Sequence, residues 1–411
     1  MIYKIKNKVI SHFSLAIIII GAGCFFVANI LLKEILSKEN YGQYSIVITY
    51  LSMIYLFGLL GLEQIFLRYS NSSIKNTIST QKFQIKLIII VILTTTTLGT
   101  FFFNYYFLKE TSINFILLYF ATLSMVSLMF MYNIFRLNSN FVFAQFISNS
   151  WKIILFFLSG VLFVYKVTDL KLLLNILMLS IILTFLFSLY SFFRKIKFTY
   201  NDSVSKKTIL ITSIQFFISI LSFSLIMFGD RFVIESKFGI EEFGNYFYLT
   251  NFFLAPFSIL QNYIGFKQLV YFKNNFRIGL FNSFNKKNLG LGVVFGLILF
   301  IIPQILNFCR IINFEFNNYI FVIVLLLILG IVRLYSASIT SAFEAKTNIQ
   351  SLQKANIIFI LLSFIIIMFV VVFCKTLELI IIAVILIWLL RTLIFKNLLL
   401  KQIKEDCENN F

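Results

Sequence analysis

Charged side chains stand within or at the edges of apolar stretches of this sequence, where a charge is costly unless it has a partner or a function. Arg333 interrupts one apolar run, and Asp230 and Arg231 adjoin in another. Glu63 and Arg68 lie near the end of a third. A guanidinium binds an oxyanion through its planar fork, and a carboxylate can take up a proton or a sodium ion. We therefore predict substrate-binding roles for the three arginines and ion-coupling roles for the two carboxylates.

Each of these charges also has a structural interpretation. Arg333 can reach the membrane surface or join an ion pair between helices. Arg231 and Glu235 stand four residues apart, the spacing of a salt bridge along one helix. Arg68 can anchor the inner end of its helix, and so can Lys267, which we add to the substrate-binding candidates. The sequence leaves both interpretations open for each residue.

Residues for metal binding or nucleophilic catalysis are scarce. The single histidine is His12, in the first turns of an apolar segment, and the four cysteines lie far apart, at Cys24, Cys309, Cys374 and Cys407. No CxxC pair and no HExxH motif is present. We predict no catalytic residue, no metal site and no cofactor other than a coupled proton or sodium ion.

The composition excludes whole classes of protein. Of 411 residues, 60% are hydrophobic and only 12% are charged, whereas a soluble globular protein carries about 25% charged residues. A soluble enzyme, a disordered regulator and a nucleic-acid-binding domain are therefore excluded, despite a net charge of +19. The composition predicts an integral membrane protein.

Apolar segments long enough to cross a bilayer recur along the whole chain. A spanning helix needs about 20 mostly apolar residues. We predict twelve such helices, near residues 10–32, 42–66, 87–108, 113–135, 149–166, 170–193, 208–234, 244–270, 289–308, 318–341, 354–374 and 377–397. The protein is expected to be all-α.

The first apolar segment has some features of a signal peptide. Lysines precede it, and Gly21–Cys24 loosely resembles a lipoprotein cleavage site. The apolar run continues to Leu32, however, and is longer than the 7–15 residues typical of a signal core. We interpret it as the first spanning helix.

The distribution of lysine and arginine predicts the orientation in the membrane. With the N-terminus in the cytoplasm, most of the 35 Lys and Arg residues fall in the termini and the inner loops, and only Arg231 and Arg333 fall inside helices. This is the positive-inside pattern. Both termini are therefore expected in the cytoplasm, and the longest inner loops are 67–86, 194–207 and 271–288.

A short motif occurs twice, at equivalent places in the two halves of the chain. Glu39–Tyr44 follows the first predicted helix and Glu241–Tyr246 follows the seventh, at a constant offset of 202 residues. Because six helices separate them, both halves enter the membrane from the same side. We predict two six-helix bundles, 1–200 and 201–397, related by a pseudo-twofold axis normal to the membrane, and a cytoplasmic tail, 398–411.

The same motifs carry a resemblance to a known family. Leu36–Tyr44, Gly61–Glu63 and Leu67–Tyr69 resemble the start of the polysaccharide-repeat-unit (O-antigen and capsule, Wzx-type) flippases. Gly229–Phe232 before Glu241–Tyr246 is similar to the junction of the seventh and eighth helices in that family. The family is a branch of the multidrug/oligosaccharidyl-lipid/polysaccharide (MOP, MATE-like) exporter superfamily.

This resemblance implies a function. The expected substrate is an oligosaccharide linked to a polyprenyl (undecaprenyl-type) diphosphate, moved by alternating access from the cytoplasmic to the outer leaflet of the bacterial inner membrane. The anionic diphosphate requires cationic side chains in a hydrated cleft, and no catalytic nucleophile. Expected partners are membrane lipids, a polysaccharide polymerase and its chain-length machinery, but no nucleic acid. One departure from the family is Lys38, where proline is frequent.

Three alternatives remain at this point. A cation-coupled multidrug exporter would need a cavity dominated by carboxylates and aromatic rings. A multispanning polysaccharide polymerase would need a sizeable external loop, and we predict none. A peptidoglycan-precursor flippase is chemically similar but would have two further helices.

Overall fold

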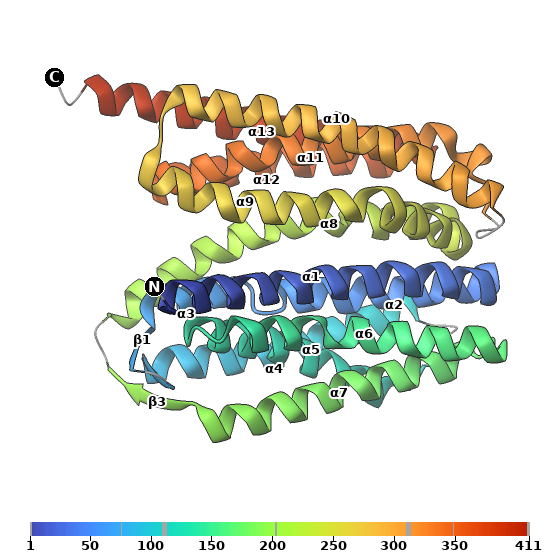
Figure 1. Ribbon diagram of the computed structural model, residues 1–411, viewed down its shortest axis with the longest axis horizontal. Coiled ribbons are helices and arrows are strands. Elements are labelled where there is room, and N and C mark those ends of the chain that lie inside the picture. Colours follow the sequence, from blue (N-terminus) through green and yellow to red (C-terminus); the bar gives the residue numbers. More distant parts are fainter. Residues whose placement is uncertain are drawn as a thin grey trace. The chain divides into compact units, whose positions relative to one another are not determined.

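The structure is a computed structural model that describes residues 2–74, 76–108, 113–201, 204–309, 314–347 and 349–408. The chain divides into two compact units, an amino-terminal unit, Met1–Leu221, and a carboxy-terminal unit, Ser222–Phe411. Nearly all described residues are helical (Figure 1). The all-α membrane fold expected from the composition is confirmed.

Long helices lie side by side in the amino-terminal unit, with α1 packed along α6 (Figure 1). Besides the first part of α8, this unit contains α1 (Ile2–Ile35), α2 (Lys38–Phe57), α3 (Leu62–Tyr69), α4 (Lys82–Phe107), α5 (Phe115–Leu137), α6 (Phe141–Tyr165) and α7 (Leu170–Lys195). Helix α5 contacts α2, α4, α6 and α7, so its side chains are buried on several faces.

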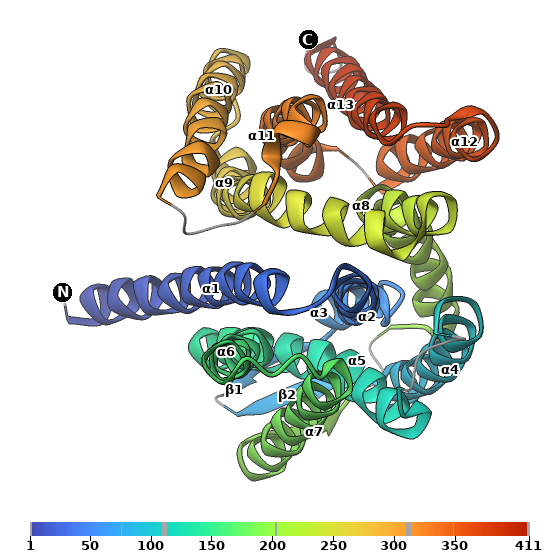
Figure 2. The ribbon, with the colours of Figure 1, turned by 90° about the vertical axis from the view of Figure 1, so that its right-hand side faces the viewer.

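In the carboxy-terminal unit, α11 is central and packs against α9, α10 and α13 (Figure 2). Helix α8 (Lys206–Leu249) enters this unit, which also contains the π-helical turn η1 (Thr250–Leu254), α9 (Ala255–Asn275), α10 (Ile278–Phe308), the 3-10 turn η2 (Phe316–Tyr319), α11 (Ile320–Lys346), α12 (Ile349–Phe373) and α13 (Leu377–Glu408). A helix enclosed in this way is expected to be apolar nearly all round. The first half of α11 is, whereas its second half buries Arg333, Ser336, Ser338 and Ser341.

The number of spans differs from the prediction. Within the described residues, ten helices are long and apolar enough to cross a bilayer, and Lys206–Leu221 with Ile226–Gly265 qualifies together as one broken span, giving at most eleven. The predicted count of twelve is not confirmed. The predicted seventh and eighth helices run on from α8 into α9. The span is broken between Leu221 and Ile226, and α8 is interrupted again at Gly239, whose φ is +83°. One glycine in the left-handed region turns the chain without a polar loop, which hydropathy alone does not detect.

A small sheet forms where only loops were expected. Strand β1 (Asn71–Ile74) pairs antiparallel with β2 (Thr77–Thr80), and β3 (Lys197–Tyr200) pairs parallel with β2. The sheet thus joins the two predicted inner loops 67–86 and 194–207. At one end, Asn138 Oδ1 accepts a hydrogen bond from the backbone N of Asn76 at 3.0 Å, which ties the β1–β2 turn to α5.

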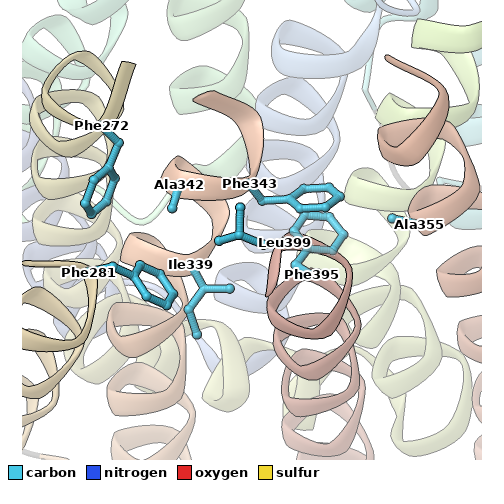
Figure 3. Packing of buried hydrophobic residues seen from close by; sticks show 8 residues of the cluster. All are labelled: Phe272, Phe281, Ile339, Ala342, Phe343, Ala355, Phe395 and Leu399. Atoms are coloured by element: carbon cyan, nitrogen blue, oxygen red, sulfur yellow. The ribbon is translucent and has the colours of Figure 1, made fainter. Parts of the chain in front are cut away.

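The packed core of the carboxy-terminal unit draws on all five of its helices after η1 (Figure 3). The rings of Phe343 and Phe395 stack with centroids 4.5 Å apart, joining α11 to α13. The full cluster is Phe272, Phe281, Ile339, Ala342, Phe343, Ala355, Phe395 and Leu399. It holds α11 in place below the residues described next.

Helices α1 and α6 pack closely together at Gly21. A Cβ added to this residue would lie 2.6 Å from Cβ of Asn149, a contact that real side chains do not make. Gly23, two residues on, has no atom within 4 Å of such a Cβ. The Gly21–Cys24 segment lies inside α1, and its first glycine permits the helix contact.

We predict that Gly21→Ala destabilises the protein and that Gly23→Ala does not. The clash involves a Cβ fixed to the backbone of α6, so the helices must separate, at a cost of about 1–3 kcal/mol. Thermal unfolding in detergent would show a lower midpoint for Gly21→Ala, and an unchanged or higher one for Gly23→Ala because alanine favours a helix. Equal midpoints for the two variants would contradict the close contact.

Candidate functional site

Arg333 lies in the middle of α11 and is buried inside the carboxy-terminal unit. Its guanidinium carbon stands 4.8 Å from the centre of the Trp388 ring, on α13. Nη1 donates to Oγ of Ser258 on α9 at 3.5 Å, and Nη2 contacts Sδ of Met227 on α8. Nε is buried and has no partner in the described part of the chain. The close contacts of this cation are thus an aromatic face, a thioether and one weakly bound hydroxyl, and the charge of Asp230 also acts on it.

A cavity of about 110 Å³ opens beside this guanidinium. Such a volume accommodates several water molecules or a small polar group. The polar and charged residues of its wall are Asp230, Arg231, Thr250, Ser258 and Arg333, together with Trp388 and Met227. The carboxy-terminal unit therefore gathers three predicted site residues, Asp230, Arg231 and Arg333, around one space.

Asp230 supplies the negative charge of this cavity. Its Oδ2 accepts a hydrogen bond from the hydroxyl of Tyr246, and the carboxylate interacts electrostatically with Arg231 and Arg333. Its Oδ1 is buried without a hydrogen-bond partner among the described residues. The guanidinium of Arg231 lies 5.5 Å from the ring of Phe247. Oδ1 of Asp230 and Nε–H of Arg333 thus lie at the same cavity, and neither has a hydrogen-bond partner among the described residues.

The repeated motif has the same structural role in both units. Tyr246, the last residue of the second copy, donates to Asp230, which lies in the part of α8 before Gly239. Tyr44, the last residue of the first copy, reaches back in the same way to Asn29 of α1, with 3.2 Å between its hydroxyl and Oδ1. Both tyrosines are fully buried. The partner is neutral in the amino-terminal unit and a carboxylate in the carboxy-terminal unit.

The other predicted site residues lie elsewhere. Glu63, in α3, is buried in the amino-terminal unit, and its Oε2 has no described partner. Arg68, at the end of the same helix, is exposed, with its guanidinium 5.9 Å from the ring of Tyr69. The two charges therefore occupy different environments. Lys267 belongs to α9, but its side chain lies outside the described residues.

Sequence reasoning missed two cations that stand inside helices. Arg391, assigned to the cytoplasmic side by the positive-inside count, is buried near the middle of α13. Its Nη1 donates to Oγ1 of Thr340 at 3.1 Å, its guanidinium lies 4.4 Å from the Phe395 ring, and it interacts electrostatically with Glu344. Lys152, also assigned to the inner side, stands near the middle of α6. Arg391 is flanked by apolar runs and Lys152 is followed by one, Ile153–Leu158, so the positions of both within apolar segments were the signal that the count overlooked.

Comparisons with known proteins place this arrangement in a known fold. No family model matches the chain, and no curated protein sequence matches it. Among solved structures, the lipid II flippase MurJ in an inward closed conformation superposes with a TM-score of 0.69 at 14% identity, over 95% of this chain and 87% of that one.

Two further solved structures share the fold. A multidrug resistance MATE family transporter of the MOP superfamily, outward-facing, gives a TM-score of 0.56 at 12% identity, over 97% of this chain and 94% of that one. A MOP superfamily transporter from Pyrococcus furiosus, with a binding pocket described as of reverse polarity, gives a TM-score of 0.55 at 12% identity. The match covers 96% of this chain and 94% of that one. At these identities the likeness establishes the fold of MOP transporters.

We predict that Tyr246→Phe destabilises the protein more than Tyr44→Phe. A hydrogen bond to a charged group contributes about 1.5–3 kcal/mol and one between neutral groups about 0.5–1.5 kcal/mol. Chemical unfolding of the two purified variants would measure the difference, and adding Asp230→Asn to Tyr246→Phe should remove most of the excess. Equal losses of unfolding free energy in the two variants would contradict the assignment of a neutral hydrogen bond to Tyr44 and a charged one to Tyr246.

Proposed function

We propose that the protein is a MOP-fold flippase that moves a lipid with an anionic head, an oligosaccharide on a polyprenyl diphosphate, from the cytoplasmic to the outer leaflet. The observation that carries this proposal is the buried Arg333, in the middle of a membrane helix, which lines a cavity together with Asp230 and Arg231 and whose Nε–H has no partner among the described residues. An arginine held there at such a cost is a functional residue by default. Its planar fork suits a phosphate oxyanion.

The chemistry required of such a protein is binding, without any covalent step. A diphosphate cannot cross hydrocarbon unaided, whereas the prenyl tail can remain in the lipid. Arg333 and Arg231 would take the place of water around the phosphate oxygens, and Ser258 and Thr250 add hydroxyl groups to the same cavity wall. Arg68 and Lys267 would act outside this cavity.

The comparisons support the lipid-linked class of substrate. One neighbour in fold is described as a lipid II flippase, and the motifs Leu36–Tyr44 and Gly229–Phe232 favour the O-antigen and capsule branch. Two six-helix halves, alternating access, an inner-membrane location and cytoplasmic termini belong to the same proposal. A polymerase and its chain-length machinery would take over the delivered repeat unit.

A cation-coupled drug exporter is the second candidate, because two other neighbours in fold include a multidrug resistance transporter. Asp230, paired with Tyr246, is the residue that favours it. Two arginines interact with this carboxylate, however, so the cavity is a poor site for an organic cation. We assign Asp230 to coupling instead, where uptake of a proton or a sodium ion would free Arg333 for the substrate.

The decisive experiment is lipid extraction from cells that lack the protein. We expect complete repeat units on prenyl diphosphate to accumulate and to be protected from an external glycosidase. Exposed but unpolymerised units would point to a polymerase. No accumulation, with altered drug sensitivity, would favour the exporter.

We predict that Arg333→Ala abolishes transport while the amount of protein in the membrane is unchanged. Loss of the guanidinium removes the cavity's mid-helix anchor, and Arg333→Lys should retain part of the activity, since it keeps the charge but loses the planar fork. Accumulated lipid-linked units and immunoblots of membranes measure the two quantities. Loss of the protein from the membrane would instead show that Arg333 is structural.

We predict that Asp230→Asn removes the dependence of transport on the coupling ion. The amide keeps the size of the side chain but can neither take up a proton nor balance a sodium ion. Transport into vesicles would be measured across imposed proton and sodium gradients. Unchanged transport with unchanged ion dependence would exclude Asp230 as the coupling residue.

A further inference from the structure

Helix α6 carries a polar face through the middle of the amino-terminal unit. Gln145, Ser148, Asn149 and Lys152 follow the spacing of one helix face. Their side chains lie in a helix that is otherwise apolar and long enough to span a bilayer. A polar stripe ending in a cation is costly at that depth, so its partners decide what it can do.

Hydrogen bonds run along this face towards Lys152. Gln145 Nε2 donates to the hydroxyl of Tyr132 at 3.2 Å, and Asn149 Nδ2 donates to the backbone O of Gln145 at 2.9 Å. Lys152 Nζ donates to Oδ1 of Asn149 at 3.1 Å. The amide of Asn149 is thereby oriented with its oxygen towards the ammonium group.

Helix α1 fixes this arrangement from the other side. Gly21 brings the α1 backbone against Asn149, and Phe25 packs edge-on against Trp151 with centroids 5.6 Å apart. The Trp151 ring in turn lies 5.7 Å from Nζ of Lys152. The lysine and the tryptophan are thus held beside each other by two packed helices.

Lys152 and Trp151 have more hydrogen-bond donors than the described residues around them have acceptors. An ammonium group has three donors, and the described contacts use one, to Asn149. No carboxylate of the described residues interacts electrostatically with Lys152. Trp151 is 3% exposed, and its Nε1–H is buried without an acceptor in the described part of the chain. The unmet requirement is an anion with several acceptor oxygens.

We propose that Lys152 and Trp151 form a second anion site, in the amino-terminal unit, for a phosphate group carried on a lipid. A lipid phosphate brings both the negative charge and the oxygens that the two donors lack, and its chains stay in the bilayer. The inference rests on the proposed function for its preferred source, the prenyl diphosphate. The phosphate of a bilayer phospholipid has the same chemistry and is the other source.

The two tryptophans of the chain make this site separately measurable. Trp151 stands beside Lys152, and Trp388 stands beside Arg333 in the carboxy-terminal unit. A Trp388→Phe variant leaves Trp151 as the only indole, and Trp151→Phe leaves Trp388. Each single-tryptophan protein then reports on one cation through its fluorescence.

The test titrates the purified Trp388→Phe protein with a short-chain prenyl diphosphate and, separately, with phosphatidylglycerol. We expect saturable change in Trp151 emission, weakened about tenfold or more by Lys152→Gln, because a hydrogen-bonded charge is lost. Lys152→Arg should restore binding, and Lys171→Gln, which alters an exposed lysine at the start of α7, should leave it unchanged. Native mass spectrometry of the unmodified protein, with and without Lys152→Gln, repeats the comparison without removing a tryptophan.

The outcomes separate this inference from the proposed function. Unchanged affinity for both lipids in folded Lys152→Gln and Trp151→Phe proteins overturns the second site, even if Arg333→Ala still abolishes transport. Binding of phosphatidylglycerol alone, dependent on Lys152, supports the site and counts against the prenyl diphosphate as its source. If Lys152→Gln does not fold, a flat Trp151 response in the Trp388→Phe protein overturns the inference.

Discussion

A bilayer offers no water to a charge held at mid-depth, so the protein itself must supply every partner of such a charge. Three cations inside the helices meet this constraint to different degrees. Arg391 has a hydroxyl, an aromatic face and the charge of Glu344 as partners. Arg333 has the same kinds of partner in Ser258, Trp388 and Asp230, but its buried Nε–H has no acceptor among the described residues. Lys152 uses one of its three donors in the described contacts. Donors left without an acceptor thus distinguish the two cations suited to a ligand from Arg391, which joins α13 to α11.

The two units solve the same packing problem with different chemistry. In each, a buried tyrosine donates a hydrogen bond to a residue before a break in the helical chain: Tyr44 of α2 to Asn29 of α1, and Tyr246 to Asp230 across Gly239 within α8. Asn29 accepts the first bond and stays neutral, whereas Asp230 accepts the second and brings a charge next to Arg333. The same tyrosine contact is therefore neutral in the amino-terminal unit, whereas in the carboxy-terminal unit it includes a carboxylate that interacts with arginines.

Much of the fold could be predicted from the length of the apolar segments alone. A membrane helix must satisfy its backbone hydrogen bonds internally, so it is visible in the sequence as an uninterrupted apolar run. The same logic selected Arg333 and Asp230, but not their meeting in one cavity, which depends on how α8, α9, α11 and α13 pack. The position of Lys152 inside a helix was not predicted, because a count of loop charges assigns every cation near a predicted helix end to the surface. The break at Gly239 was not predicted, because one residue in the left-handed region ends a helix without changing its hydropathy.

The small sheet has a consequence for how the chain is made. Strand β2 leaves the ribosome well before β3, and helices α4 to α7 are synthesised between them. The edge of β2 that pairs with β3 therefore stays open until the chain has passed Tyr200, by which time four further helices, α4 to α7, have been made. Pairing of β3 with β2 is then among the last steps in forming the amino-terminal unit, and until that step β2 presents an unpaired edge.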